Sequence, residues 1–487
     1  MINPHLTKLT SLSLSSILTI LMFSPFTTTS AYAREYLSVY GKDGVFIQHK
    51  LIEEASVNHH FDEDNRCIKA VFDDWIFGKE EIPVSEIDSC LIKYGEIPAL
   101  YIKLEDFPEA TSLWEKDLYL NATLDIEGNG TAEDEFALSL KIKGRGNSTW
   151  NMPKKPIRLK FSKKTSICGF KKAKNYVLLN NYIDPSMMRN AMAMWVARRL
   201  EVPYSNTIVP VHLFLNDHYQ GAYTLTEKVG INSSSVDIDE ETGILFEMDT
   251  NYDEPYKFRS ETYDLPMMVK DPDFEELYEE NPSTLSPSDR LLIWEEDFNK
   301  AEQMVAEGNA FEAFDLENAV NYLLVYDLTC NHELAHPKSF YIHKYSLEKG
   351  EKYNFGPAWD FDASFNLAIP TTSDEDESYF TRNPYHSLNV NSFLRTLMDM
   401  PEFKQRYKER FEEFLTEDFD DMLDFFDSYA ALIDDSARLN ARRWPGESIF
   451  QNWAYVLPSD DRQRHVLELR QWIIERIACL KTRILSE

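Results

Sequence analysis

Two aspartates, Asp360 and Asp362, lie two residues apart between large apolar side chains in residues 355–365. A strand-like run at residues 339–345 and a charged turn come before them. In an extended backbone, residues i and i+2 point to the same side, so both carboxylates are predicted to face one way. A hard cation such as Mg²⁺ or Ca²⁺ between them would remove their mutual repulsion. A surface turn in which the aspartates accept hydrogen bonds from backbone amides fits the same residues.

Positive charge gathers around a glycine-rich turn at residues 144–150. Strands are predicted on both sides of this turn, at residues 136–143 and 157–161, and alternation places Arg158 and Lys160 on one face of the second strand. Exposed amides of a glycine turn beside fixed cations suit phosphate. A twisted hairpin with a solvated basic face is the alternative. The cations of this region are Arg145, Lys154, Lys155, Arg158 and Lys160.

Two further polar groups follow along the chain. Glu227 and Lys228 end a predicted strand, so they should face opposite sides and find separate partners. Residues 331–333, Asn-His-Glu, follow a predicted helix that Asp315 caps. Phosphoryl transfer needs cations around the phosphates, carboxylates for Mg²⁺ and a group that positions the acceptor hydroxyl. The candidate residues described so far include all three. Spacing alone does not separate this set from that of a metal-dependent hydrolase.

Composition limits the class of protein. The chain has 487 residues and a formal net charge of -32, which argues against general binding to nucleic acid. Residues 1–33 read as a signal peptide, with Lys8, an apolar run and an Ala-Tyr-Ala cleavage site before Arg34. We therefore expect an exported protein, periplasmic, at the cell surface or extracellular, with no membrane span in the mature chain. The five cysteines show no Cys-x-x-Cys pair. A Cys67–Cys90 disulfide and buried free thiols both fit.

The predicted organisation is α+β. Residues 34–95 alternate in short hairpin-like runs and are predicted to form a small β accessory module. Residues 96–487 form the main domain, whose part from about residue 391 is helical, and no repeat recurs in it. Helices are predicted after Asp184, as an N-cap with proline behind it, and from Ser459 to the end of the chain.

Several motifs together resemble the spore-coat-protein-H (CotH) kinase family, in the family order and over roughly residues 97–480. They are the residues 144–150 and 154–160, 180–189, 223–228 and 359–362. The resemblance implies an atypical protein-kinase-like fold that uses ATP with Mg²⁺ or Mn²⁺. It further implies transfer of the γ-phosphate to Ser or Thr of an exported protein.

On this resemblance each candidate residue takes a role. Asp360 is expected to bind Mg²⁺ with help from Asp362, and Glu333 to position or deprotonate the acceptor hydroxyl. The expected phosphate contacts are Arg145, Arg158, Lys160 and Lys228, with Glu227 orienting one of them.

The sequence departs from the family pattern at Glu333 and Ser339, where many members have Asp and Asn. Glu333 moves its carboxylate one methylene further out, and a misplacement of about 1 Å can cost on the order of 10²-fold in rate. A kinase-like surface protein with weak or no catalysis, which binds a partner or a glycan, is therefore the alternative. A carboxylate-based glycan hydrolase fits less well, because acids two residues apart are poorly placed to flank a sugar bond.

Overall fold

The computed structural model describes residues 35–41, 46–51, 56–61, 67–74, 78–83, 87–94, 97–127, 138–331, 333–335, 337–365, 388–444 and 462–485. Within these ranges, side chains are described from Ile97 onward, except those of residues 335, 388–391, 435, 438, 439 and 442. The chain divides into two compact units, residues 1–99 with 126–131, and residues 100–125 with 132–487. The architecture is mixed α+β, as the sequence predicts.

The first unit contains two antiparallel sheets of three strands. One has the order β2 (Phe46–Leu51), β1 (Glu35–Gly41), β6 (Ile87–Tyr94). The other has the order β3 (Ser56–Phe61), β4 (Cys67–Asp74), β5 (Gly78–Pro83). The hairpins β1–β2 and β4–β5 agree with the alternation that predicted them. The side chains of Cys67 and Cys90 lie outside the described part of the chain, so their predicted pairing stays a prediction.

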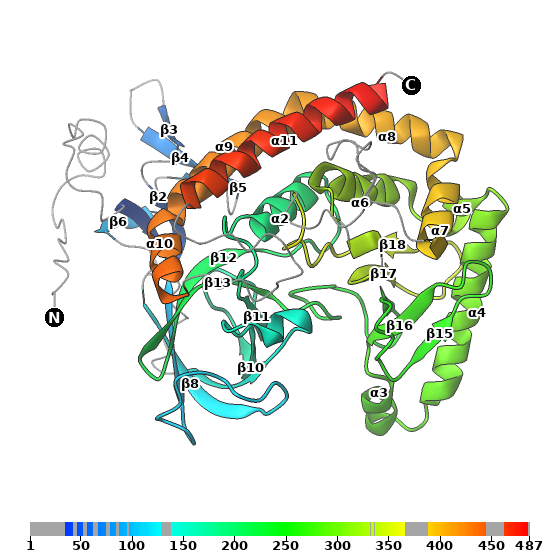
Figure 1. Cartoon of the computed structure of the whole chain (residues 1–487), viewed down its shortest axis with the longest axis horizontal. Helices are drawn as coiled ribbons and strands as arrows, with labels where there is room; N and C mark the ends of the chain where they lie inside the picture. The colour runs from blue at the N-terminus through cyan, green and yellow to red at the C-terminus, as the bar shows by residue number, and fades with distance from the viewer. Residues whose placement is uncertain are drawn as a thin grey trace. The chain divides into compact units, whose positions relative to one another are not determined.

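A closed barrel forms the first half of the large domain (Figure 1). Its strands follow the order β10 (Ile157–Thr165), β11 (Ala173–Leu179), β13 (His218–Glu227), β12 (Val209–Leu215), β7 (Ala99–Leu104), β8 (Leu120–Glu127), β9 (Leu138–Gly144). Alternate residues of β9 and β10 are buried, which places an apolar stripe inside the barrel and leaves the residues between them on the outer surface.

A five-stranded sheet follows, in the order β15 (Lys257–Arg259), β16 (Pro266–Asp271), β14 (Ile244–Met248), β17 (Phe340–Lys344), β18 (Asn354–Phe355). The helices that precede it or cover it are α2 (Arg189–Arg199), α3 (Phe274–Glu280), α4 (Pro287–Ala306), α5 (Ala310–Ala313) and α6 (Leu316–Thr329). Asp315 caps α6, because its side chain accepts a 2.8 Å hydrogen bond from the Asn318 amide. That prediction is confirmed.

Helix α2 begins later than predicted. Asp184 does not stand directly before it but accepts hydrogen bonds from the amides of Met188 and Arg189, both at 2.9 Å, across an intervening turn. Met187 in this turn has a φ of 60°, so the first helical residue is Arg189. Asp184 still accepts hydrogen bonds from free amides at the helix start, although it lies four residues before the N-cap residue Met188.

The C-terminal part is helical, as predicted. It contains α7 (Leu388–Met398), α8 (Pro401–Glu413), α9 (Phe419–Leu432), α10 (Asp434–Arg443) and α11 (Arg462–Leu485), with α11 running beside α9 over α2 and α6 (Figure 1). Helix α11 buries an apolar stripe of Leu469, Trp472, Ile473, Ile477 and Leu480. In the described ranges, no helix has the length and apolarity needed to cross a membrane.

Candidate functional site

A cavity of about 350 Å³ lies between the barrel and the five-stranded sheet. Its walls come from the turn after β9, the segment after β11, helix α2, strands β14, β16 and β17, and the two segments that flank β17 and β18. Its charged and amide side chains include Arg145, Asn147, Asn180, Asn190, Glu247, Asp249, Lys270, Glu333, Lys338, Asp360 and Asp362.

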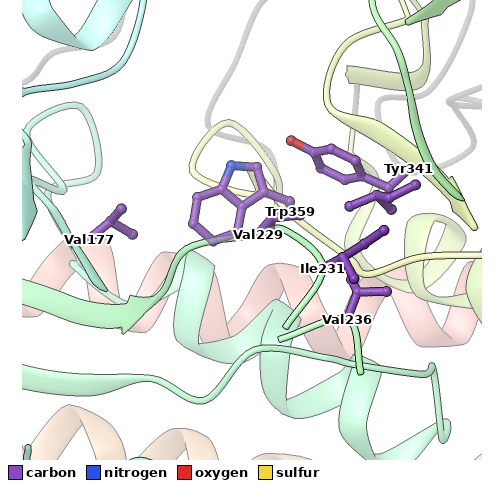
Figure 2. Packing of buried hydrophobic residues seen from close by; sticks show 7 residues of the cluster. Val177, Val229, Ile231, Val236, Tyr341 and Trp359 are labelled. Atoms are coloured by element: carbon purple, nitrogen blue, oxygen red, sulfur yellow. The ribbon is translucent and has the colours of Figure 1, made fainter. Parts of the chain in front are cut away.

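An apolar cluster supports the inner wall of this cavity (Figure 2). Val177 of β11, Tyr341 of β17 and Trp359 belong to it, and the segment between β13 and β14 adds Val229 and Ile231. Trp359 packs in this cluster and also lines the cavity. The cluster thus joins the barrel to the segment that carries the two aspartates.

Asp360 and Asp362 both line the cavity, but their backbone is not extended as predicted. Asp360 has a φ of 65°, in the left-handed region, and residues 362–365 form a turn. Such a conformation is costly for a non-glycine residue and tends to occur where function requires it. Ser339, with a φ of 49°, lies close enough to the Asp360 carboxylate to lower its pKa and offset part of the effect of burial. The serine that departs from the family pattern therefore still contacts this aspartate.

Asn331 connects the two segments that carry the acidic side chains. Its Oδ1 accepts a hydrogen bond from the Glu333 amide at 2.9 Å, and its Nδ2 donates to the Asp360 carbonyl at 3.3 Å. Asn190 of α2 fixes the same segment from the other side, because its Oδ1 accepts from the Phe361 amide at 3.0 Å. These amides hold Glu333 and Asp360 beside one cavity, as the sequence predicts. His332 and His336 lie outside the described residues.

The three cavity carboxyls bind protons unusually tightly. Desolvation and then the charges of Asp360 and Asp362 raise the pKa of Glu333 to about 8. Desolvation and the charge of Asp360 raise the pKa of Asp362 to about 8. Desolvation also raises the pKa of Asp360, although water reaches this side chain through the cavity and Arg145 offsets part of the effect. Each group makes ionisation of the others less favourable.

Three cations line the cavity with these acids, namely Arg145, Lys270 and Lys338. The Arg145 guanidinium stacks over the Trp359 ring, with 5.6 Å between Cζ and the ring centroid. Lys270 Nζ lies 2.7 Å from Glu247 Oε2 and 3.0 Å from Glu254 Oε1. Sequence reasoning named Arg145 but missed Glu247 and Lys270. The available signal was a charged residue inside each of two otherwise apolar strands.

The other predicted phosphate contacts do not line the cavity. Arg158 Nη2 donates to Asn175 Oδ1 at 2.9 Å, and Lys160 lies on the outer barrel surface with Nζ 5.7 Å from the Tyr119 ring centroid. Both side chains lie on the outer face of the barrel, and neither is among the residues that line the cavity.

Glu227 and Lys228 have separate partners, as expected. Glu227 Oε2 accepts a hydrogen bond from the Thr207 amide at 2.9 Å, and Lys228 Nζ donates to the Val229 carbonyl at 3.3 Å. Desolvation, with the nearby charges of Arg158 and Lys270, lowers the pKa of Lys228 to about 8. Glu227 fixes a loop behind the cavity, so its placement differs from the predicted contact with a phosphate-binding cation.

Lys154 does not contribute to a basic surface. It is fully buried, and its Nζ donates to Asn440 Oδ1 of α10 at 2.7 Å and lies 4.4 Å from the centroid of the Tyr223 ring. Desolvation lowers its pKa well below the usual value. The predicted cationic role is wrong for this lysine, because it fastens α10 to strand β13 instead.

A comparison with protein families identifies the domain that contains this cavity. The model of the CotH kinase protein family matches residues 142–480, which contain every wall of the cavity. The chain belongs to the CotH kinase family. A comparison with curated proteins found no match. Family membership implies a kinase-like protein that uses ATP, so the cavity residues can be compared with what ATP and a divalent metal require.

The acids of this CotH kinase domain suit a hard cation by their chemistry. Glu333 Oε2 is buried with no hydrogen-bond partner among the described residues, and Asp360 and Asp362 raise its pKa by repulsion. A bound divalent cation would satisfy that oxygen and remove the repulsion. Within the described ranges, no group of three or more His, Cys, Asp or Glu side chains is already arranged to hold a metal. The donors are present, and closing them around a cation needs movement of side chains.

Proposed function

We propose that this CotH-family protein is an exported protein kinase that transfers the γ-phosphate of ATP to a Ser or Thr hydroxyl of a secreted or surface protein. The observation that supports it best is the gathering of Glu333, Asp360, Asp362 and Arg145 around one cavity within the matched domain. Acids for a metal and a cation for phosphate are the components that phosphoryl transfer requires. The barrel on one side and the helical part on the other would form the two lobes of an atypical kinase-like fold.

The cavity residues take different roles in the proposed reaction. Asp360 and Asp362 would hold Mg²⁺ or Mn²⁺, which supplies charge neutralisation for the phosphates. Arg145 would contact the phosphates, since it is the predicted cation that lines the cavity. Glu333 would accept the proton of the acceptor hydroxyl. A base with a pKa of about 8 is well matched to this task near neutral pH.

The ion pair between Lys270 and Glu247 would hold the cavity wall formed by strands β14 and β16 in place. Glu247 accepts a hydrogen bond from the Tyr341 hydroxyl at 3.0 Å in addition to its ion pair with Lys270. Tyr341 belongs to the cluster that also holds Trp359, so the charge pair and the aspartate segment are packed against one another. We assign Lys270 and Glu247 a positioning role.

The direct test is incubation of the purified protein with γ-labelled ATP and a Ser-rich protein, with Mg²⁺, Mn²⁺ or a chelator. We expect label on the protein hydroxyls that depends on the metal. Nucleotide binding without transfer would contradict a kinase and would support the alternative, a kinase-like surface protein that binds a partner or glycan.

A further inference from the structure

Four cations face one another in pairs on the outside of the barrel. The register of β9 and β10 sets Lys143 opposite Arg158, and Lys141 opposite Lys160. The residues between them on each strand are buried inside the barrel, so all four side chains lie on the outer face. Like charges directly opposite one another destabilise a strand pair. Folding of this hairpin therefore gains nothing from this choice of residues.

The described part of the chain leaves this charge largely uncompensated. Lys143 has an ion pair with Asp117 at 3.2 Å, and both residues are accessible to solvent. Within the described ranges, Lys141, Arg158 and Lys160 form no ion pair. In a chain with a net charge of -32, an uncompensated strip of cations is unusual, and it would attract an anionic ligand.

The strip leads into the candidate active site. Arg145 follows Lys143 by two residues and lines the cavity, and its amide donates to the Pro156 carbonyl at 3.2 Å, which continues the ladder of the two strands. Pro156, which also lines the cavity, precedes Arg158 by two residues. Residues two apart on a strand are about 7 Å apart, and an extended peptide presents alternate side chains with that same spacing.

An aromatic ring lies beside the cations of the strip. The centroid of the Tyr119 ring is 5.2 Å from Lys143 Nζ and 5.7 Å from Lys160 Nζ. These contacts hold the two ammonium groups over the ring without neutralising them. The cations are thereby kept on the face of the sheet, where a bound chain would meet them.

We propose that the cationic strip, Lys141, Lys143, Arg158 and Lys160, binds an acidic segment of the protein acceptor, with Asp or Glu at alternate positions beside the hydroxyl that enters the cavity. This inference deepens the proposed function and rests on it. It also gives Arg158 and Lys160 a ligand other than the nucleotide. The continuity of the strip with the cavity favours a peptide, because neither a membrane surface nor a nucleic acid would need to reach the cavity.

Fluorescence anisotropy on the full chain tests the strip without ATP. Labelled peptides with one Ser and acidic, neutral or basic flanks serve as probes. We expect the acidic peptide to bind most tightly, with an affinity that falls as salt rises, and the double variant K141E/K160E to bind it about tenfold more weakly. The variant K300E/K349E has the same change in net charge on exposed lysines elsewhere and should bind like the wild type.

The other possible outcomes separate this proposal from its alternatives. Equal affinity for the three peptides, or equal loss in K300E/K349E, would overturn the proposal. Binding of vesicles rich in anionic lipid that is lost in K141E/K160E, without a preference for the acidic peptide, would overturn it in favour of a membrane surface. The single variant Lys160→Gln, which removes charge without reversing it, should show a smaller loss with an unchanged melting temperature.

The same experiment separates this inference from the proposed function. Wild-type protein that binds the acidic peptide but transfers no phosphate to any peptide would contradict the kinase assignment and leave the docking strip standing. Wild-type protein that phosphorylates the three peptides with equal efficiency would contradict the strip and leave the kinase assignment standing.

Discussion

At the scale of single residues, the protonation of Glu333 and Asp362 is the property that most distinguishes this cavity. Both carboxyls have a pKa of about 8, because desolvation and the negative charge of Asp360 oppose their ionisation. In an unfolded chain both groups would titrate near their ordinary values, close to about 4. The folded protein therefore holds protons that the unfolded chain releases.

The first prediction concerns stability against pH in the presence of a chelator. Between about pH 4 and pH 8 the folded state binds more protons than the unfolded state, so the free energy of unfolding should fall as pH rises through this window. The melting temperature measures this. Asp362→Asn should flatten the slope, because the variant no longer places that charge in the cavity, and an unchanged slope would contradict the assignment.

The second prediction follows from the same groups. Added Mg²⁺ should raise the melting temperature more at about pH 8 than at about pH 5, because the carboxyls must be ionised to bind a cation. The comparison variant is Asp399→Asn. The Asp399 side chain is 71% exposed, lies between helices α7 and α8, and is not among the residues that line the cavity. This variant should respond to Mg²⁺ like the wild type. A response independent of pH would contradict a carboxylate site.

Residue types alone predicted part of the site. Asp360 and Asp362 were found because acids beside apolar residues indicate a supported cluster, whereas Glu333 took its role from the resemblance to the CotH kinase family. Lys154 was misassigned because a lysine in a basic run gives no sign of burial, and its partner Asn440 is 286 residues away in sequence. Lys270 was missed for the same reason, since its partners lie on strand β14 and in the segment before β15.

At the scale of elements, the turn between β9 and β10 has a strict backbone requirement. Gly146 has a φ of 80°, and a Cβ built on it would collide with Thr149 Oγ1. The following residues form the 3₁₀ helix η2 (Ser148–Asn151), and residues of both line the cavity. The turn therefore fixes the wall beside Arg145.

The third prediction is that Gly146→Ala destabilises this turn by about 1–3 kcal/mol, from backbone strain and the contact with Thr149. It should also weaken nucleotide binding, because the cavity wall shifts. Gly308→Ala is the matched control: its φ is 84°, and a Cβ there has nothing within 4 Å. Urea unfolding and nucleotide titration measure both effects. A loss of nucleotide affinity in both variants would contradict the assigned role of the turn.

Strands and helices were easier to predict than the segments between them. Alternation located β9 and β10, and helical spacing located α11, because burial on one side imposes a period on the sequence. The left-handed residues Ser339 and Asp360 follow no such period. Their conformation depends on tertiary contacts, so the extended backbone predicted for the aspartates was wrong.

At the scale of the whole domain, a buried ionic cluster joins the C-terminal helices to the core. Asp327 of α6 is fully buried, and its Oδ1 lies 3.2 Å from Arg476 Nη2 of α11. Arg483 of α11 and Tyr407 of α8 also contact this carboxylate. Asp327 and Arg476 are 149 residues apart, so no local pattern could have predicted the pair.

The fourth prediction is that Asp327→Asn lowers the free energy of unfolding by about 3–5 kcal/mol, because it removes the buried negative charge that Arg476 and Arg483 contact. Urea denaturation measures the loss. Asp399→Asn, which removes an exposed ion pair with Lys404, should change stability by less than about 1 kcal/mol. Similar small losses in both variants would contradict the role of the buried cluster.

The measurement that tests the central claim most directly is transfer of label from γ-labelled ATP in Mg²⁺, compared between the wild type, Asp360→Asn and Asp399→Asn. The account predicts labelling of protein hydroxyls by the wild type and by Asp399→Asn. It predicts at least a 10²-fold loss in Asp360→Asn, of the size seen when a group that stabilises transition-state charge is removed. Undiminished labelling by Asp360→Asn, in a preparation free of other kinases, would contradict the claim that phosphoryl transfer takes place in this cavity.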